Sequence, residues 1–324
     1  MSASARWKIN RAYEKLLRER TREQAKKTSI ITGDVVEFCK KQLGFKPTAY
    51  QEKFLRDTAQ FVVLRWSRQS GKSQIIAALT LYRVLSSPGS KVAVLAPSLR
   101  QSRKIIRRIQ SFLPRLPPWV LNGRPLKTKV EFVNGSMIEA LPNSPETIRG
   151  ETLDMVVVDE LGFVGNDEEL YDAVVYSLAT TDGRFIGAST PGSRDSLFYA
   201  MCTDDEQFKD VSRHHVSYRE ALEPKGPLKK KILEKIRHQM AHDQWRWQRE
   251  MEAEFAEDED TWLSLDLIKK CIDPELENFD ENLLLVSLPS ESVLPPAHDG
   301  IIHKGVDSLG TQISWCVLDK QQHS

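Results

Sequence analysis

The residues best suited to chemistry form a short loop of small and charged side chains. The loop reads Trp66-Ser67-Arg68-Gln69-Ser70-Gly71-Lys72-Ser73. An apolar run, 61–65, comes directly before it, and a run with helical spacing, 72–85, follows. A loop between a strand and a helix is the context in which a phosphate-binding P-loop occurs. Backbone N–H groups and the helix N-terminus would surround the β- and γ-phosphates of ATP. Lys72 would neutralise these phosphates, and the Ser73 hydroxyl would join the coordination shell of Mg²⁺.

One position departs from the usual pattern of such loops. Trp66 stands where the first glycine is expected, so the letters alone give an incomplete match. A Gly-Lys-Ser triplet also arises often by chance. The prediction of a phosphate-binding loop therefore depends on the strand before the loop and the helix after it, more than on the motif itself.

Two carboxylates follow a second apolar run. Met155–Val158 is wholly apolar, and Asp159 and Glu160 come directly after it. Ligands of open α/β sheets bind at the carboxyl ends of the strands. There, Asp159 would hold Mg²⁺ through water, and Glu160 would orient or deprotonate the attacking water. The alternative is a pair of acids that caps a strand in a turn; the upstream Lys72 and Ser73 favour the catalytic interpretation.

The elements that must position these residues alternate between strand and helix from Pro47 onward. Strands are expected at 61–65, 91–96, 155–158 and 185–188, and helices at 72–85 and 98–113. Asn134-Gly135 lies between two further strand-like runs and predicts a hairpin. This alternation predicts an α/β fold with an open, mostly parallel sheet and helices on both faces. A single long polar helix is expected over 228–255, and His214 and His215 receive no role.

Charge is segregated along the chain, although the net charge is only +1 over 324 residues. Residues 98–129 hold nine Lys/Arg and no acid, whereas residues 151–169 hold seven acids and no Lys/Arg. The expected helix 98–113 exposes five cations on its polar face. They are Arg100, Arg103, Lys104, Arg107 and Arg108. This face is either simply solvated or binds the phosphate backbone of DNA without sequence preference.

Composition narrows the cellular setting. The four cysteines are far apart in the sequence, which predicts neither a disulfide framework nor a zinc site. No apolar run approaches the ~20 residues that span a bilayer. We expect a protein of a cytoplasm that has no membrane partner.

Several motifs together resemble the large terminase ATPase of tailed phages and related viruses. In that family the first glycine of the phosphate loop is often missing and an arginine lies inside the loop, as in 67–69. The segment 147–152, just before the acidic strand, is similar to the family's Arg-Gly segment. Ala188-Ser189-Thr190-Pro191-Gly192 is similar to its coupling motif, and Pro47-Thr48-Ala49-Tyr50-Gln51 to its adenine-reading Q motif. The resemblance covers roughly residues 46–265 and, more weakly, the tail.

The resemblance implies roles for four further residues. Gln51 would hydrogen-bond the adenine edge, and Thr190 would sense the γ-phosphate. Arg68 and Arg149 would stabilise charge that develops on the γ-phosphate, as arginine fingers do. Whether either arginine acts in its own subunit or in a neighbour stays open, and for Arg149 a salt bridge to a nearby acid is the alternative.

The tail resembles the start of the RNase H-like nuclease that follows the motor in this family. Residues 301–306 form an apolar strand that leads to Asp307, which would be a metal ligand, and 311–319 could return as its antiparallel partner. A two-metal nuclease needs several carboxylates. We therefore expect the chain to be a fragment that lacks the remaining ligands; the alternative is an ordinary surface hairpin.

The sequence thus predicts four parts. They are a basic helical arm (1–45), a P-loop ATPase domain of the ASCE type (46–262), a linker (263–299) and the beginning of a truncated RNase H-like domain (300–324). The resemblance implies ATP- and Mg²⁺-dependent movement of double-stranded DNA into a viral procapsid. Its partners would be the portal protein, the small terminase subunit and further copies of the chain. The rival hypotheses are a helicase-type translocase and a nucleotide-gated assembly protein with little hydrolysis.

Overall fold

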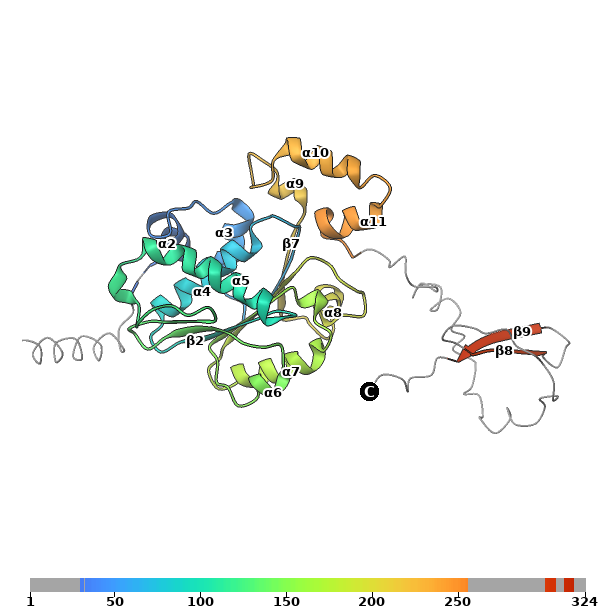
Figure 1. Ribbon diagram of the computed structural model, residues 1–324, viewed down its shortest axis with the longest axis horizontal. Helices are drawn as coiled ribbons and strands as arrows, with labels where there is room; N and C mark the ends of the chain where they lie inside the picture. Colours follow the sequence, from blue (N-terminus) through green and yellow to red (C-terminus); the bar gives the residue numbers. More distant parts are fainter. Residues whose placement is uncertain (1–29, 32, 256–300, 307–311, 318–324) are drawn as a thin grey trace, which may run out of the picture. The chain divides into compact units, whose positions relative to one another are not determined.

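The computed structural model describes residues 30–31, 33–255, 301–306 and 312–317. The chain divides into two units, Met1–Ser264 and Leu265–Ser324. The first unit is built on one sheet with helices on both sides, and the described part of the second is a strand pair (Figure 1). Residues 1–29, the N-terminal part of the predicted arm, lie outside the described residues.

The sheet of the first unit has seven strands in the order β3-β4-β2-β5-β6-β1-β7. All neighbours pair in parallel except β3 and β4, which form the antiparallel hairpin predicted around Asn134-Gly135. The strands are β1 (Phe61–Trp66), β2 (Lys91–Leu95), β3 (Lys129–Glu131), β4 (Met137–Ala140), β5 (Met155–Asp159), β6 (Arg184–Ser189) and β7 (Val211–Val216). The predicted α/β fold with a mostly parallel sheet is confirmed.

The central strands are apolar on both faces because helices cover both faces. Along β1, Val62 and Leu64 belong to one hydrophobic cluster and Val63 to the other. Helices α2 (Val35–Lys41), α3 (Ala49–Arg56), α4 (Lys72–Ser86) and α5 (Leu99–Phe112) build the first cluster. Helices α6 (Pro145–Ile148), α7 (Asp167–Leu178) and α8 (Leu197–Thr203) supply residues of the second.

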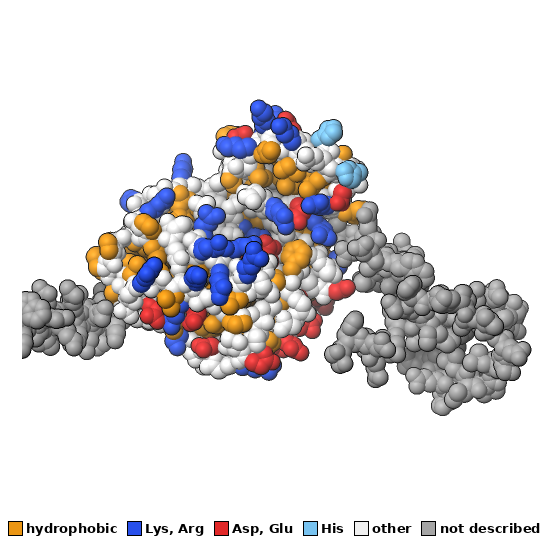
Figure 2. All heavy atoms as spheres, viewed as in Figure 1, with side chains coloured by type: hydrophobic (Ala, Val, Ile, Leu, Met, Phe, Trp, Pro, Cys, Tyr) orange, Lys and Arg blue, Asp and Glu red, His pale blue; other side chains and the backbone are white. Residues whose placement is uncertain are grey.

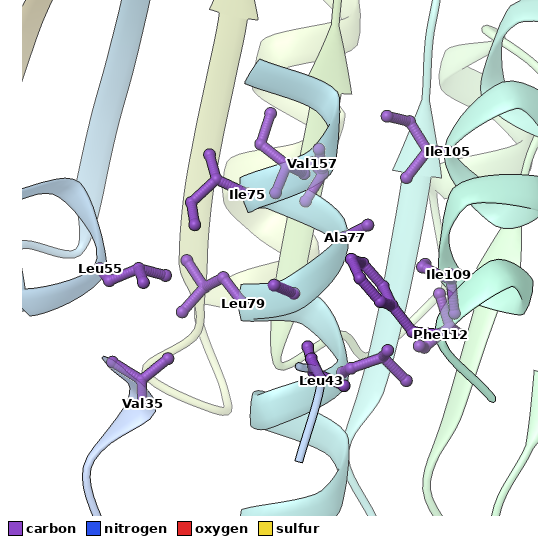
Figure 3. Packing of buried hydrophobic residues seen from close by; sticks show 14 of the residues in the cluster. Val35, Leu43, Leu55, Ile75, Ala77, Leu79, Ile105, Ile109, Phe112 and Val157 are labelled. Atoms are coloured by element: carbon purple, nitrogen blue, oxygen red, sulfur yellow. The ribbon is translucent and has the colours of Figure 1, made fainter. Parts of the chain in front are cut away.

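The first cluster fixes helices α4 and α5 against the sheet (Figure 3). Ile75 of α4 and Ile105 and Ile109 of α5 are completely buried. Residues 33–45 join this cluster as well, since Val36 and Leu43 are 0% exposed. The end of the segment that the sequence assigned to a basic arm is therefore part of the hydrophobic core of the first unit.

The segment after β7 differs from the expectation of one helix over 228–255. It contains α9 (Tyr218–Ala221), α10 (Lys230–Gln239), α11 (Gln244–Trp247) and a π-helix (Gln248–Glu252). The chain breaks after α10 because Asp243 caps a new helix: its carboxylate accepts a 2.9 Å hydrogen bond from the backbone N–H of Arg246. Leu233, Trp247 and Met251 form a small cluster of their own.

Among the described residues of the first unit there are also three short 3₁₀ helices: Leu113–Arg115, Pro118–Val120 and Leu161–Phe163. In the second unit, β8 (Ile301–Val306) and β9 (Gln312–Val317) pair antiparallel, as predicted for a hairpin. Asp307 lies outside the described residues. Within the described parts of the chain, no helix has the length and apolarity needed to cross a bilayer.

Candidate functional site

The strand order brings three motifs to one edge of the sheet. Strand β6 pairs with β1 on one side and with β5 on the other. Carboxyl ends of parallel strands meet at the same edge. The phosphate loop after β1, the acid pair at the end of β5 and Thr190 after β6 are therefore neighbours, with Thr190 in the middle.

The phosphate loop has the backbone shape that an anion site requires. Gln69 and Gly71 have φ of 60° and 85°, and helix α4 begins at Lys72. Backbone N–H groups that converge in such a turn, ahead of a helix N-terminus, form a concave anion site. A Cβ on Gly71 would lie 2.6 Å from the side-chain amide nitrogen of Gln51, so both the φ value and the packing favour glycine there.

The missing first glycine is explained by the position of Trp66. Its side chain is completely buried, with edge contacts to the rings of Tyr50 (centroids 5.1 Å apart) and Phe54 (6.0 Å). The indole therefore packs into the core and leaves the phosphate side of the loop open. A bulky side chain is tolerated at position 66 because it points into the core, where it packs on α3.

Helix α3 holds the loop by hydrogen bonds as well. The Tyr50 hydroxyl and the Gln51 amide donate to the carbonyl of Ser70, at 2.7 and 3.4 Å. The amide oxygen of Gln51 accepts from the backbone N–H of Thr48 at 3.0 Å. Both ends of the Gln51 amide are thus engaged within the protein, and adenine recognition by this side chain stays a prediction.

A cavity of about 780 Å³ opens over the loop. Its lining consists of Phe45, Lys46, Thr48, Gln51, Ser67, Arg68, Gln69, Gly71, Lys72, Ser73, Gln74, Lys104, Arg108, Glu160, Thr190, Gly226 and Pro227. Most of the residues predicted from the sequence to bind or hydrolyse nucleotide therefore face one space. Ser70 is completely buried behind it, where its hydroxyl donates to the carbonyl of Ser67 at 2.7 Å.

Asp159 lies buried at the end of β5, with a relative exposure of 7%. Burial raises the pKa of this carboxyl to about 6; the positive charges of Lys72 and Lys104 oppose the rise, and the charge of Glu160 adds to it. Among the described residues, its carboxylate oxygen Oδ1 has no hydrogen-bond partner. A buried acceptor without a partner is costly unless something binds it. Together with the Ser73 hydroxyl in the cavity lining, it suits a divalent cation that takes oxygen ligands.

Glu160 occupies a strained position at the edge of the cavity. Its φ of 56° lies in the left-handed region, which residues other than glycine rarely adopt. Ser189, the last residue of β6, donates a 3.4 Å hydrogen bond to its carboxylate. Strain of this kind is maintained at functional sites when the surroundings over-determine the conformation. The hydrogen bond ties the acid to strand β6, which directly precedes Thr190.

A backbone contact between two glycines supports the same arrangement. A Cβ on Gly192, in the motif after β6, would lie 2.0 Å from the carbonyl oxygen of Gly162, in the turn after Glu160. The two loops therefore touch backbone to backbone. The sequence predicted the motif at 188–192 but neither the turn at Leu161–Phe163 nor this contact.

The two candidate arginine fingers have different surroundings. Arg68 lines the cavity, but its guanidinium forms a 2.5 Å ion pair with Glu250 of the π-helix, and its backbone N–H donates to the Glu250 carbonyl at 2.8 Å. Arg149, directly after α6, is exposed and is not part of the cavity lining. Its action in its own subunit or in a neighbour stays open.

The five cations of α5 divide into two groups. Lys104 and Arg108 line the nucleotide cavity, whereas Arg100, Arg103 and Arg107 are exposed outside its lining. Lys and Arg side chains gather over this helix on the face of the molecule shown in Figure 2. The sequence placed all five in a single candidate DNA surface. It could not show which flank of the helix faces the phosphate loop.

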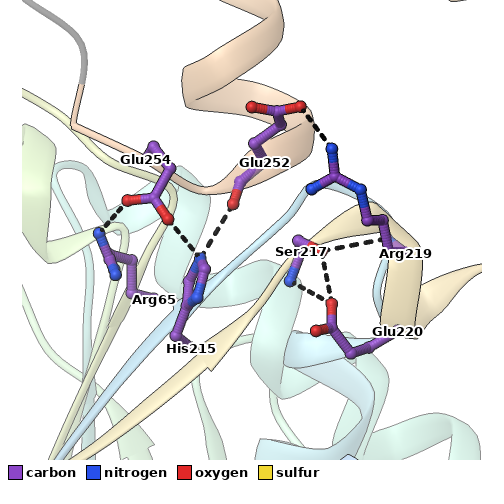
Figure 4. A network of polar contacts seen from close by, with 7 residues as sticks. All are labelled: Arg65, His215, Ser217, Arg219, Glu220, Glu252 and Glu254. Carbon is purple, nitrogen blue, oxygen red and sulfur yellow. Dashed lines mark hydrogen bonds and ion pairs between the residues drawn. The ribbon is translucent and has the colours of Figure 1, made fainter.

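A network of polar contacts joins β1, β7 and α9 to the end of the π-helix and the residues after it (Figure 4). Glu254 accepts from Arg65 at 2.8 Å, and His215 lies 3.4 Å from the same carboxylate. Arg219 pairs with Glu252 at 3.2 Å. In the sequence, the alternation of apolar and polar residues at 211–216, which include His215, is what indicates a strand. It predicted no function.

Comparisons with known proteins agree with this geometry. Residues 64–270, more than half of the chain, match the family described as "Terminase large subunit, T4likevirus-type, N-terminal". A large terminase subunit of Thermus phage G20c is 29% identical over 168 residues, 46% of this chain and 34% of that protein. The chain thus spans about a third of the length of this curated relative.

Solved structures share the fold at low sequence identity. A variant ATPase domain of the large terminase from Thermus phage P74-26 superposes with a TM-score of 0.55 at 21% identity, covering 68% of this chain and 98% of that one. The large terminase of a thermophilic bacteriophage, in complex with ADP, gives a TM-score of 0.53 at 14% identity, covering 65% of this chain and 54% of that one. The fold is that of large terminase ATPase domains, and by the match over residues 64–270 this chain belongs to the terminase large subunit family.

Proposed function

We propose that this chain hydrolyses ATP to move double-stranded DNA, as the motor part of a terminase large subunit. One observation carries the proposal: a P-loop, a strained glutamate and the threonine between them face a single cavity, beside a buried carboxylate with an oxygen that no described residue binds. This set of groups contains what phosphoryl transfer to water needs, namely positioning, charge neutralisation and a base.

The residues would divide the work as follows. Lys72 and the backbone of residues 67–73 hold the β- and γ-phosphates. Ser73 and Asp159 hold Mg²⁺, which, when bound, neutralises charge on the phosphate oxygens. Glu160 accepts the proton of the attacking water. Thr190 lies between the loop and the acid pair, so it can respond to the presence of the γ-phosphate.

Movement of DNA is the finer part of the proposal. The cations Arg100, Arg103 and Arg107 form an exposed basic surface on α5, which suits contact with a phosphate backbone regardless of sequence. In this role the protein would load DNA into a procapsid in the host cytoplasm. It would act as a ring of copies on the portal protein, with the small terminase subunit as partner. Arg149, exposed beside α6, would be accessible to a neighbouring copy.

The nuclease would belong to a longer protein. The antiparallel pair β8–β9 agrees with the first strands of an RNase H-like domain, and Asp307 follows β8 directly in the sequence. In this proposal Asp307 is one of several metal ligands there. Cutting of concatemeric DNA would then require the carboxylates that complete the set.

Hydrolysis can be tested with two substitutions in the motor. Lys72→Ala is expected to abolish nucleotide binding and ATPase activity. Glu160→Gln is expected to retain ATP binding and to slow turnover by ~10²–10⁴-fold, the usual contribution of a general base. Steady-state phosphate release and equilibrium nucleotide binding measure the two effects separately. Near-normal turnover of the Glu160→Gln protein would remove Glu160 from the catalytic role.

A further inference from the structure

Helix α5 supplies two cations to the nucleotide cavity that the phosphate loop does not account for. Lys104 and Arg108 line the cavity together with Lys72 and Ser73. Residues four apart on a helix lie one above the other on the same flank. Lys104 and Arg108 are therefore neighbours along the helix axis on one flank of α5. Arg103 and Arg107 form a second such pair on another flank.

The orientation of this flank is fixed by packing. Ile105, Ile106 and Ile109 are completely buried on the opposite side of the helix. Phe112, at the end of α5, stacks on Phe45 with ring centroids 5.7 Å apart, and Phe45 is itself part of the cavity lining. Rotation of α5 that would turn Lys104 away from the cavity would expose these apolar side chains to water.

Both cations are available for a ligand. Within the part of the chain that the structure describes, neither Lys104 nor Arg108 forms an ion pair. Arg68, by contrast, is paired with Glu250. The side chain of Lys104 lines the same cavity as Lys72 and Ser73, where phosphates and a divalent cation would meet.

We propose that Lys104 and Arg108 bind phosphate oxygens of the nucleoside triphosphate, as a second cationic wall opposite the phosphate loop. This inference rests on the proposed ATPase function and extends its site to α5. Charge-assisted hydrogen bonds from ammonium and guanidinium groups are the usual ligands of a polyphosphate. The same helix carries Arg103 and Arg107 on its other flank, so the nucleotide and DNA would be held by one rigid element.

The test compares nucleotide binding by alanine variants that remove equal charge. Lys104→Ala, Arg108→Ala and the double variant are titrated with a non-hydrolysable ATP analogue, with ADP and with AMP, in Mg²⁺. The matched controls are Arg124→Ala and Lys127→Ala. Both residues are exposed, belong to the same acid-free segment and lie outside the cavity lining. Thermal unfolding checks that each variant folds as the parent does.

We expect each cavity variant to raise the Kd for the ATP analogue roughly tenfold, the size of one lost charge-assisted contact, with a smaller effect on ADP and none on AMP. Lys104→Arg should bind the ATP analogue about as tightly as the parent, since it keeps the positive charge. The controls should bind like the parent. Equal Kd values for the double variant and the parent overturn the proposal, as does an equal rise for cavity variants and controls. If the α5 proposal fails in either way but Lys72→Ala still loses ATP binding, the proposed ATPase function stands. A parent chain that binds no ATP would overturn both the α5 proposal and the proposed function.

Discussion

Asp159 and Glu160 are neighbours in the chain, yet their carboxylates have different surroundings. Asp159 is buried and keeps an oxygen that no described residue binds, while Glu160 turns into the cavity with a left-handed backbone. Two identical functional groups can take different roles when their environments differ. Here the difference separates a cation ligand from a base, and it is produced by the sharp turn at residue 160.

Asp57 is another carboxylate whose surroundings determine its charge. Its carboxylate accepts from the Ser212 hydroxyl at 2.6 Å and from the backbone N–H of Ala59 at 2.7 Å, and His214 Nε2 lies 2.6 Å away. Burial alone would raise the pKa of Asp57, but these hydrogen bonds together lower it from its usual value of 3.8. The contacts fasten the turn after α3 to strand β7.

A lowered pKa fixes the sign of the pH dependence. The stabilising contribution of Asp57 is fully present above 3.8 and is lost as the pH falls through its lowered folded-state pKa. We expect Asp57→Asn to reduce the free energy of unfolding at neutral pH by about 1–2 kcal/mol. The difference from the parent should shrink as the pH falls below 3.8 and through the lowered pKa of Asp57. Urea unfolding over a pH series measures it.

Asp210→Asn is a suitable control, because Asp210 is exposed. It should change the stability little at any pH of the series. A deficit of Asp57→Asn that stays constant from neutral to acidic pH would show that the ionised carboxylate is not what stabilises this contact.

At the scale of elements, the contact between Gly162 and Gly192 sets how closely the turns after β5 and β6 approach. Because the clashing atom is a backbone carbonyl, a side chain at Gly192 cannot be accommodated by a rotamer change. We expect Gly192→Ala to cost about 1–3 kcal/mol of stability, as overpacking does. We also expect it to lower ATPase activity more than nucleotide binding, since it moves Thr190 relative to Glu160. Chemical unfolding, phosphate release and nucleotide titration measure the three quantities.

Gly165→Ala is the matched control for this change. Gly165 follows the same turn, but a Cβ there would meet no atom of the described residues within 4 Å. The control protein should match the parent in stability and turnover. If both alanine variants lose activity equally, the glycine contact is not what couples the two turns.

The sequence predicted the elements whose periodicity is strong and local. The apolar runs of β1, β2, β5 and β6 and the helix after the phosphate loop were located within one or two residues, because their burial pattern is continuous. Strand β7 carries polar residues on its partly exposed positions, so its alternation was noticed without being assigned to the sheet. The break after α10 depends on the helix cap at Asp243. Because the residues around it are also polar, the sequence does not distinguish Asp243 as a cap.

Prediction of the site was limited in the same way. Residue types at 67–73, 159, 160 and 190 indicate their chemistry directly, and the structure places them at one edge of the sheet. The sequence did not predict which exposed residues of α5 line the nucleotide cavity. Helical spacing separates the buried face from the exposed face, but it does not show which other elements lie next to the exposed face. Likewise, the contact of the Gln51 amide with the Ser70 carbonyl is a tertiary contact that no local pattern encodes, whereas its contact with Thr48 belongs to the capping box at the start of α3.

At the scale of the whole molecule, the proposed nuclease and the proposed motor depend on different residues. Between residues 301 and 317 the sequence offers one carboxylate, Asp307. One carboxylate cannot hold two metal ions ~4 Å apart to clamp both the attacking and the leaving oxygen. We therefore expect residues 1–324 to hydrolyse ATP but to leave supercoiled plasmid intact in Mg²⁺ or Mn²⁺, as measured by gel electrophoresis.

A longer version with the native downstream sequence should cut the plasmid, and Asp307→Ala should stop it. Robust cleavage by residues 1–324 alone, after removal of contaminating nucleases, would contradict the assignment of Asp307 to an incomplete nuclease. The motor assignment does not depend on this result, since it rests on other residues.

The contacts of the π-helix segment have a mechanical consequence. The chain that leaves the first unit is fastened to β1 and its loop at two points, Arg65 with Glu254 and Arg68 with Glu250. A pull on Phe255 would load its own contacts first, namely the Arg194 hydrogen bond to its carbonyl and its ring contacts with Phe198 and Tyr199. It would then reach the two arginines, one near the end of β1 and the other inside the phosphate loop. Tension on the exit segment would thus reach the residues around the nucleotide without having to deform the sheet, and the same two attachments would carry movement of the loop outward along the chain.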